Sequence, residues 1–416
     1  MKKPQDLFPD YLDIFDRFIV EASFLWVLRS LSVNQPHYDV DDIRALENRI
    51  QANLDGLMTS TDTAWSLCEK AMELNGPGET FTAAIVAFKS GDISKINRVI
   101  DAGLETPVAT KGLISAIAWL PAALRQPWIH TFLVSKDTQQ NYLAICLCSL
   151  LRQNPGDFLN QYLLRDAGLQ HEKLHARCLR LAGEMKRHDV LPSVIRAIHS
   201  DSEHIAFWAN WAALLLGNKD NIKKLEPYVF NTCDEQARAL NIVFRVLTVH
   251  PAREWVSRLA VDRQQTRAAI KAAGIVGDPL AVDGLIEKMT DATQARVAGE
   301  AFSLITGIDL EQSRLSLDSP LQPAQVPSED VNDPIVTLDE DEHLPWPNAT
   351  LIAARWQQSA PQWVKGQRYF LGKEINTDNL SPILQHGFQR QRQAATMELA
   401  LLDSSRVLQN TCAKVS

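Results

Sequence analysis

A short motif of small and apolar residues returns at a nearly constant interval through the middle of the chain. Measured at one central position of each copy, the steps are 30, 30, 30 and 29 residues. These positions are Arg177, Phe207, Ala237, Arg267 and Arg296. An earlier copy at residues 143–146 lies 32 residues before the copy at residues 175–178. A fixed period of this length is typical of repeats that stack on their neighbours.

Each copy has the pattern of a helical hairpin. A helix rich in small residues comes first, as at 270–274, and a second apolar helix follows, as at Ala281–Met289. Between them Asp278 can cap the helix that Pro279 opens. The Ala and Gly positions allow neighbouring helices to approach closely, and one helix pair cannot bury its apolar face alone. The sequence therefore predicts an all-α fold with a HEAT-like α-solenoid over residues 108–306.

Apolar residues at helical spacing also precede the repeats, whereas strand-type alternation is hard to find. The spacing predicts a helix around residues 12–26 and a second at Asp39–Leu57. Further helices are expected at Thr61–Leu74, Glu79–Lys89 and Ile93–Ala102, with Gly and Pro between them. We expect these helices to form an N-terminal helical lobe over residues 1–107.

The composition changes after the repeats. Residues 307–343 contain ten acidic residues, one basic residue (Arg314) and four prolines. This composition predicts an extended acidic linker or a long surface loop. Residues 344–416 are expected to form a small C-terminal helical lobe, ending in a helix at Gln389–Leu402. Its aromatic residues are expected to give it a core of its own: Trp346, Trp356, Trp363, Tyr369 and Phe370.

Net charge and cysteine usage exclude several classes of protein. The formal charge of −8 at pH 7 argues against a chain that binds nucleic acid or an anionic membrane over its whole length. The six cysteines are scattered, and the C-x-C at Cys146 and Cys148 has no second pair to complete a zinc site. The apolar stretch 18–33 is interrupted by Glu21 and Arg29, so it is neither a signal sequence nor a membrane span. We expect a cytoplasmic protein with reduced cysteines.

One motif raises the alternative of an enzyme. His171-Glu172-Lys173-Leu174-His175 satisfies H-E-x-x-H, in which two histidines one helical turn apart bind zinc and the Glu acts as general base. Lys173 places a cation beside the proposed metal, and His171 and Glu172 fall at the start of a helix. Acids and histidines downstream, among them Glu184, leave a third ligand open. We expect a solvated helix start here, with a zinc-dependent hydrolase as the alternative.

The remaining sequence predicts neither cofactor nor catalysis. Phosphate-cradling glycine loops and a G-x-S-x-G elbow are absent. Arginines that recur in the repeats can bond neighbouring carbonyls and acids, or they can line a surface that binds an acidic partner. Two further arginines lie on the last predicted helix. The candidates for protein binding are Arg177, Arg267, Arg296, Arg390 and Arg392.

Several blocks of the C-terminal half resemble a bacterial family of HEAT-repeat proteins encoded near type VI secretion genes. They are residues 274–279 and 295–310, Leu344-Pro345-Trp346-Pro347, Gly366–Gly372 and Gly387–Ala395. The resemblance covers residues 270–402 in detail. In the upstream repeats it extends only to their general pattern of residues. It implies an adaptor or chaperone-like scaffold for a secreted effector or a tip component, and it supplies no enzymatic activity. The alternative non-enzymatic function is that of an immunity protein, which binds a cognate toxin. The sequence does not predict the oligomeric state.

Overall fold

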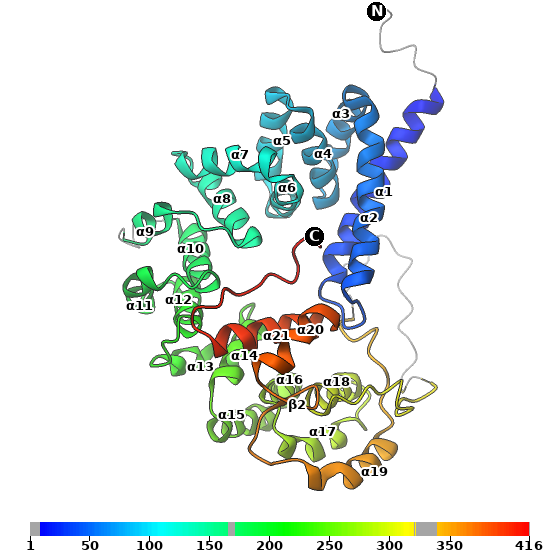
Figure 1. Cartoon of the computed structure of the whole chain (residues 1–416), viewed down its shortest axis with the longest axis vertical. Helices are drawn as coiled ribbons and strands as arrows, with labels where there is room; N and C mark the ends of the chain where they lie inside the picture. Colours follow the sequence, from blue (N-terminus) through cyan, green and yellow to red (C-terminus); the bar gives the residue numbers. More distant parts are fainter. Residues whose placement is uncertain (1–8, 165–170, 320, 322–338, 416) are drawn as a thin grey trace, which may run out of the picture. The chain divides into compact units, whose positions relative to one another are not determined.

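The computed structural model describes residues 9–164, 171–319, 321 and 339–415. They divide into two compact units. The first unit contains the described residues of 1–34, 38–212 and 407–416, and the second contains those of 35–37 and 213–406. Both units are built almost entirely from α-helices that pack on one another in chain order (Figure 1).

The first unit begins with the helices that apolar spacing predicts. Asp39 caps α2 in a capping box with Asp42, which satisfies backbone N–H groups that the first turn leaves unpaired. The helices are α1 (Pro9–Ser32), α2 (Val40–Leu57), α3 (Thr61–Ala71), α4 (Pro77–Ser90), α5 (Ile93–Glu105), α6 (Pro107–Trp119), α7 (Ala122–Val134), α8 (Thr138–Leu151), α9 (Asp157–Leu163), α10 (Glu172–Glu184) and α11 (Leu191–Ala197). Helix α12 (Glu203–Leu215) crosses the boundary between the units.

The second unit continues with helices and one short hairpin. Its helices are α13 (Glu226–Phe230), α14 (Gln236–Val246), α15 (Val249–Val261), α16 (Thr266–Val276), α17 (Val282–Lys288), α18 (Ala295–Thr306), α19 (Ala349–Ser359), α20 (Thr377–His386) and α21 (Gln389–Leu402). Strands β1 (Tyr369–Phe370) and β2 (Lys373–Glu374) pair antiparallel. The bounds of α21 are those that the sequence predicts, and Asp278 caps the turn of helix that Pro279 opens, also as predicted.

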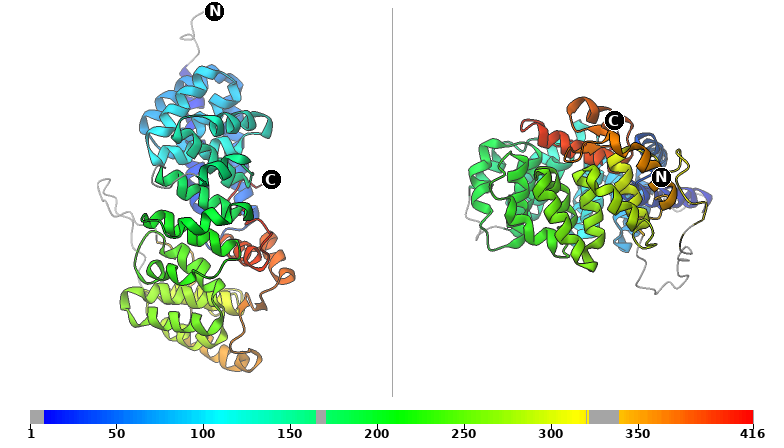
Figure 2. Two further views of the ribbon diagram at one scale, coloured as in Figure 1. Left: turned by 90° about the vertical axis from the view of Figure 1, so that its left-hand side faces the viewer. Right: turned by 90° about the horizontal axis from the view of Figure 1, so that it is seen from below.

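The six copies of the sequence motif fall on α8, α10, α12, α14, α16 and α18, and each of these helices is followed by another helix. In the first unit α4, α6, α8 and α10 pack in succession, and in the second unit α14, α16 and α18 do the same. Figure 2 shows the helices of each unit in adjacent rows. The predicted close approach of helices at small residues is confirmed at Gly183, where an added Cβ would lie 2.8 Å from the Cα of Ala212.

The hairpin β1–β2 was not predicted, and its strands are too short to form without support from their neighbours. The amide of Leu371 donates to the carbonyl of Leu304, and that of Gly372 to Ile305. Gly277 and Gly307 end α16 and α18 in the left-handed region, at φ 73° and 70°. A Cβ on either would lie within 2.5 Å of a hairpin carbonyl, so these two positions need glycine.

The aromatic residues expected to form a separate C-terminal core do contact one another, since Trp363 packs against Trp356 and Tyr369. Some of them also join the core of the preceding helices. Ile352 and Trp356 belong to one core with Leu285 and Phe302, and the Trp356 indole donates to Asp283 at 2.9 Å. Helix α19 has only two buried residues, too few for a core of its own. The boundaries predicted at residues 107, 306 and 343 stay predictions, and residues 320 and 322–338 of the acidic segment lie outside the described residues.

Four of the six cysteines are buried, as expected of small apolar residues: Cys68, Cys146, Cys148 and Cys178. Burial raises the pKa of the Cys68 thiol to about 12, so this thiol is unreactive at neutral pH. Within the described parts of the chain, none of the helices combines the length and the apolar character needed to cross a bilayer.

Two glycines test the helix packing. Gly183→Ala is expected to destabilise the protein by about 1–3 kcal/mol, because the new methyl group must displace the backbone of α12. Gly284→Ala on α17 is the matched control, since nothing lies within 4 Å of its Cβ. It should stabilise by up to about 1 kcal/mol through helix propensity. Urea unfolding measures both, and a Gly183→Ala protein as stable as the wild type would contradict this packing.

Candidate protein-binding surfaces

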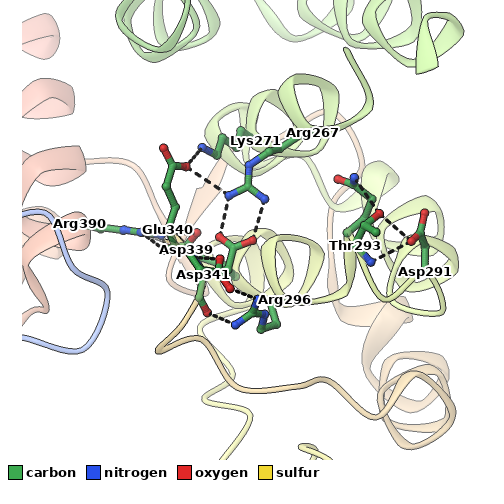
Figure 3. Close-up of polar contacts among 11 residues, drawn as sticks. Arg267, Lys271, Asp291, Thr293, Arg296, Asp339, Glu340, Asp341 and Arg390 are labelled. Carbon is green, nitrogen blue, oxygen red and sulfur yellow. Dashed lines mark hydrogen bonds and ion pairs between the residues drawn. The ribbon is translucent and has the colours of Figure 1, made fainter. Parts of the chain in front are cut away.

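Four basic side chains of the second unit converge on three consecutive acidic residues (Figure 3). Arg267 and Lys271 lie one turn apart on α16 and therefore share a face. Arg296 and Arg390 come from the first turns of α18 and α21. We call Arg267, Lys271, Arg296 and Arg390 the basic surface, and Asp339–Asp341 the acidic segment.

The strongest contact joins Arg267 to Asp341. Both terminal nitrogens of the guanidinium donate to the carboxylate, each at 2.7 Å, and Asp341 is only 5% exposed. A bidentate pair of this kind fixes orientation as well as position. Beside it, Glu340 accepts from Lys271 at 3.0 Å and from Arg267 at 3.3 Å. Two adjacent acidic side chains are thus recognised by one face of α16.

The other two arginines bind the main chain of the acidic segment. Arg296 donates to the carbonyl of Asp341 at 2.8 Å, and Arg390 donates to the carbonyl of Glu340 at 2.7 Å. Arg296 also pairs with the carboxylate of Asp339. Carbonyl contacts do not depend on the side chain, but here the two carbonyls belong to a turn at residues 340–343. The basic surface therefore contacts both the acidic side chains and the main chain of the acidic segment.

The charges of this site balance only when the acidic segment is in place. Arg390 pairs with Glu300 at 2.9 Å, which leaves Arg267, Lys271 and Arg296 to be neutralised by the three acids. The hydrogen bond from Lys271 lowers the pKa of Glu340. Burial would raise the pKa of Asp339, but the amide of Asp341 and Arg296 together lower it. Both acids are therefore ionised at neutral pH, as the contacts require.

A cavity of about 190 Å³ lies next to the acidic segment. The residues that follow the segment, His343 and Leu344, line it together with Glu300, Leu304 and Phe388. Phe388 is 38% exposed, which is unusual for so large an apolar side chain. The cavity can accept an apolar group next to the acids that the basic surface binds.

Three of the five arginines expected to bind protein meet at this site, and two lie elsewhere. Arg392 is 8% exposed and donates to the carbonyl of Leu384, so it holds α20 against α21. Arg177 lies on α10 in the first unit, among the charges around Glu184. Lys271 was not singled out in the sequence, although its spacing of four residues from Arg267 places both on one face. The binding role of all five arginines stays a prediction.

The H-E-x-x-H motif lies at the start of α10. His171 is the N-cap residue, and Glu172 is the first residue of the helix and accepts a hydrogen bond from Ser202. His175 is 3% exposed, and burial lowers its pKa. The described residues contain no group of three His, Cys, Asp or Glu side chains arranged to hold a metal ion. The zinc-dependent hydrolase stays an untested alternative.

Glu184, one of the downstream candidates for a third ligand, is held by cations instead. It is 1% exposed, accepts from Arg180 at 2.8 Å, and lies 3.2 Å from Arg152. Burial alone would raise its pKa, but the charges of Arg180, Arg152 and Arg177 outweigh it, together with a hydrogen bond from Ser149. They lower the pKa of Glu184 to about 2.

The first unit also holds a non-helical stretch of the same chain, residues 407–415, which we call the C-terminal segment. Its Leu408 amide donates to the carbonyl of Glu184 at 2.9 Å, and Arg152 donates to the carbonyl of Leu408. Asn410 donates to the carbonyl of Leu150 at 2.9 Å. Polar main-chain groups at the ends of α8 and α10 thereby find partners in a segment that has no helix of its own.

An ion pair between α1 and α2 binds the far end of the C-terminal segment. Arg29 donates to the carbonyls of Cys412 and Ala413 at 2.9 and 2.8 Å. Glu47 accepts from Arg29 at 2.8 Å and from the amide of Val415 at 2.8 Å. Both side chains are less than a tenth exposed. The sequence carried one weak signal of this site, since Arg29 interrupts the apolar stretch 18–33 and an arginine that is buried there needs a partner.

Comparisons with known proteins give no match: neither family models, nor curated proteins, nor solved structures resemble the chain significantly.

The Glu184 cluster predicts a pH dependence of stability. A carboxyl whose pKa is lowered in the folded state stabilises the protein above its ordinary pKa, near 4.5, and this contribution is lost as the pH falls towards about 2. Glu184→Gln should cost about 3–5 kcal/mol at pH 7, because it leaves arginine charges buried without a partner. Urea unfolding at pH 7, 4 and 3 should show the difference from wild type shrinking with acid. A difference that is constant with pH would contradict the assignment.

The attachment of the acidic segment can be tested at single amides. Asp341→Asn removes the ionic part of the bidentate contact, so amides of residues 341–348 should exchange with deuterium roughly tenfold faster. Glu342→Gln is the matched control, because Glu342 is exposed and adjacent. Hydrogen exchange with mass spectrometry measures both. Equal exchange in the two variants would show that Arg267 does not hold the segment.

Proposed function

We propose that this protein is a non-enzymatic scaffold of HEAT-like helical repeats that binds an acidic segment of a protein partner on the basic surface, in the turn conformation of its own acidic segment. The observation that carries the proposal is the bidentate contact between Arg267 and Asp341, with Arg296 and Arg390 on the adjoining carbonyls. The chain's own acidic segment occupies the place of the partner's segment. The partner binds by displacing it.

The HEAT-like architecture is part of the proposal. It is supported by the six motif copies on alternate helices from α8 to α18 and by the packing of these helices in chain order within each unit. In repeats of this kind the first helices of successive pairs present one continuous face. Arg267 and Arg296 stand at equivalent repeat positions on neighbouring first helices, which is why they can contact one peptide together.

Competition with the acidic segment would set the affinity and the specificity. A segment joined to the same chain has an effective concentration in the millimolar range, so a partner with the same contacts alone would bind weakly. An apolar side chain next to the acids could enter the cavity lined by Phe388 and Leu344 and supply the additional affinity. The proposed ligand is therefore an acidic stretch followed by an apolar residue.

The family resemblance supports a specific partner, an effector or tip component of the type VI secretion system. The role would then be that of an adaptor or chaperone-like protein. A helical-repeat surface suits this role because it holds a client through many small contacts rather than through one deep pocket.

Peptide binding tests the surface directly. The probe is a labelled peptide with the sequence of residues 339–348. It should bind the triple variant Asp339→Asn, Glu340→Gln, Asp341→Asn with a dissociation constant below about 100 µM, and the wild type at least about tenfold more weakly. Adding Arg267→Glu to the triple variant should abolish binding, whereas adding Arg263→Glu, an exposed position one turn away, should not. Fluorescence anisotropy that shows no binding to the triple variant would overturn the proposal.

The partner can be identified by isolating proteins that bind this chain from its native host. Bound proteins are isolated with four tagged proteins and identified by mass spectrometry. The four are the wild type, the triple variant, Arg267→Glu and Arg263→Glu. A secretion effector or tip protein that is enriched by the triple variant, lost with Arg267→Glu and kept with Arg263→Glu supports the proposed role. A bound toxin whose activity is blocked would instead assign an immunity function.

A further inference from the structure

A cavity of about 150 Å³ in the second unit lies apart from the basic surface and is not explained by the proposed function. Helix α14 contributes Arg245 and Val246, and α21 contributes Glu398, Leu401 and Leu402. Leu214, Leu215 and Arg368 complete much of the wall, and Lys219 and Ser404 also line it. The cavity thus combines apolar walls with a charged region.

The charged region contains more cations than carboxylates. Arg245 and Arg368 share the single carboxylate of Glu398, and Lys219 adds a further positive charge. The side chains of Arg245 and Glu398 are 4% and 5% exposed. A buried guanidinium without a full counter-charge is costly, so surplus positive charge in a cavity favours an anion.

The two arginines differ in how fully they are bonded. Arg368 donates to the carbonyls of Val276 and Arg245 at 3.0 Å and to Glu398 at 2.5 Å, so its donors are used inside the protein. Arg245 donates to the carbonyl of Asn241, but its Nε has no hydrogen-bond partner among the described residues. Glu398 lies 3.3 Å from this Nε without the alignment of a hydrogen bond. Arg245 therefore lines the cavity and has one buried N–H, at Nε, that no described residue accepts.

We propose that this cavity binds a small monoanionic carboxylate with a short apolar chain, with Arg245 as the principal contact for the carboxylate. One carboxylate would neutralise the surplus charge that Arg245 and Arg368 leave after Glu398. Leucines and Val246 would cover an apolar chain. The volume equals that of an engineered protein cavity that holds benzene, so a molecule of about six heavy atoms fits.

Lys219 extends the site towards a larger head group. A phosphate could use its second charge there, whereas a monocarboxylate needs only Arg245. The apolar walls favour the carboxylate, because inorganic phosphate would leave the leucines without a contact.

Ligand-observed NMR and calorimetry on the full chain test the site with sodium butyrate as the probe. Saturable binding is expected in the low-millimolar range or tighter, with no saturable binding of butylammonium or butanol, which match its length but lack the negative charge. Sodium chloride is added to equal ionic strength in all samples. Absence of saturable butyrate binding, or tighter binding of phosphate than of butyrate, overturns the proposal.

Two substitutions with opposite expected effects separate binding from folding. Arg245→Met should weaken butyrate binding at least about tenfold, whereas Arg238→Met, an exposed position on the same helix, should not change it. Glu398→Gln removes the competing carboxylate and should tighten binding by about tenfold. If Arg245→Met does not fold, the affinity of Glu398→Gln for butyrate is sufficient to test the proposal. Unchanged or weaker binding in folded Glu398→Gln contradicts a site built on surplus positive charge.

Discussion

Polar main-chain groups that are buried against a helix need hydrogen-bond partners. The backbone N–H and C=O groups in the middle of a helix cannot serve, because they are already bonded to one another. This constraint governs the non-helical parts of this protein. The C-terminal segment is bonded by Arg29, Arg152 and Glu47, and the acidic segment by Arg296 and Arg390. The same solution thus occurs in both units: long charged side chains donate to, or accept from, the backbone of a non-helical segment.

Arginine suits this task because its planar group carries several donors and stays charged when it is buried beside an acidic partner. Arg29 shows the consequence, since it donates to two successive carbonyls while it pairs with Glu47. Backbone contacts hold a segment without selecting its sequence. Selection enters only where a carboxylate is also bound, as at Arg267 and Lys271. Under the proposed function, this combination of backbone and carboxylate contacts is what would let the basic surface bind an acidic segment of a partner.

Much of the helical structure could be predicted, because the signals are local. Apolar spacing, the cap at Asp39 and the Asp278-Pro279 start lie within a few residues of what they determine. The hairpin β1–β2 could not be predicted, since its two-residue strands are stabilised by the carbonyl ends of α16 and α18 rather than by strand propensity. The aromatic residues near the C-terminus were expected to pack with each other. Trp356 does contact Trp363, but it also joins the core around Phe302, because α19 alone buries too little surface.

The sequence by itself therefore determined the helices, their repetition and a short set of arginines suited to binding. It could not determine which of those arginines meet. Arg267 and Asp341 are 74 positions apart and Arg29 and Cys412 are 383 apart, so each contact depends on the packing of every helix between or around them. Tertiary structure placed Arg267, Arg296 and Arg390 on one surface and buried Arg392 between α20 and α21. The physical reason is range: helical periodicity acts over about four residues, whereas ion pairs form between whichever charges the folded chain brings together.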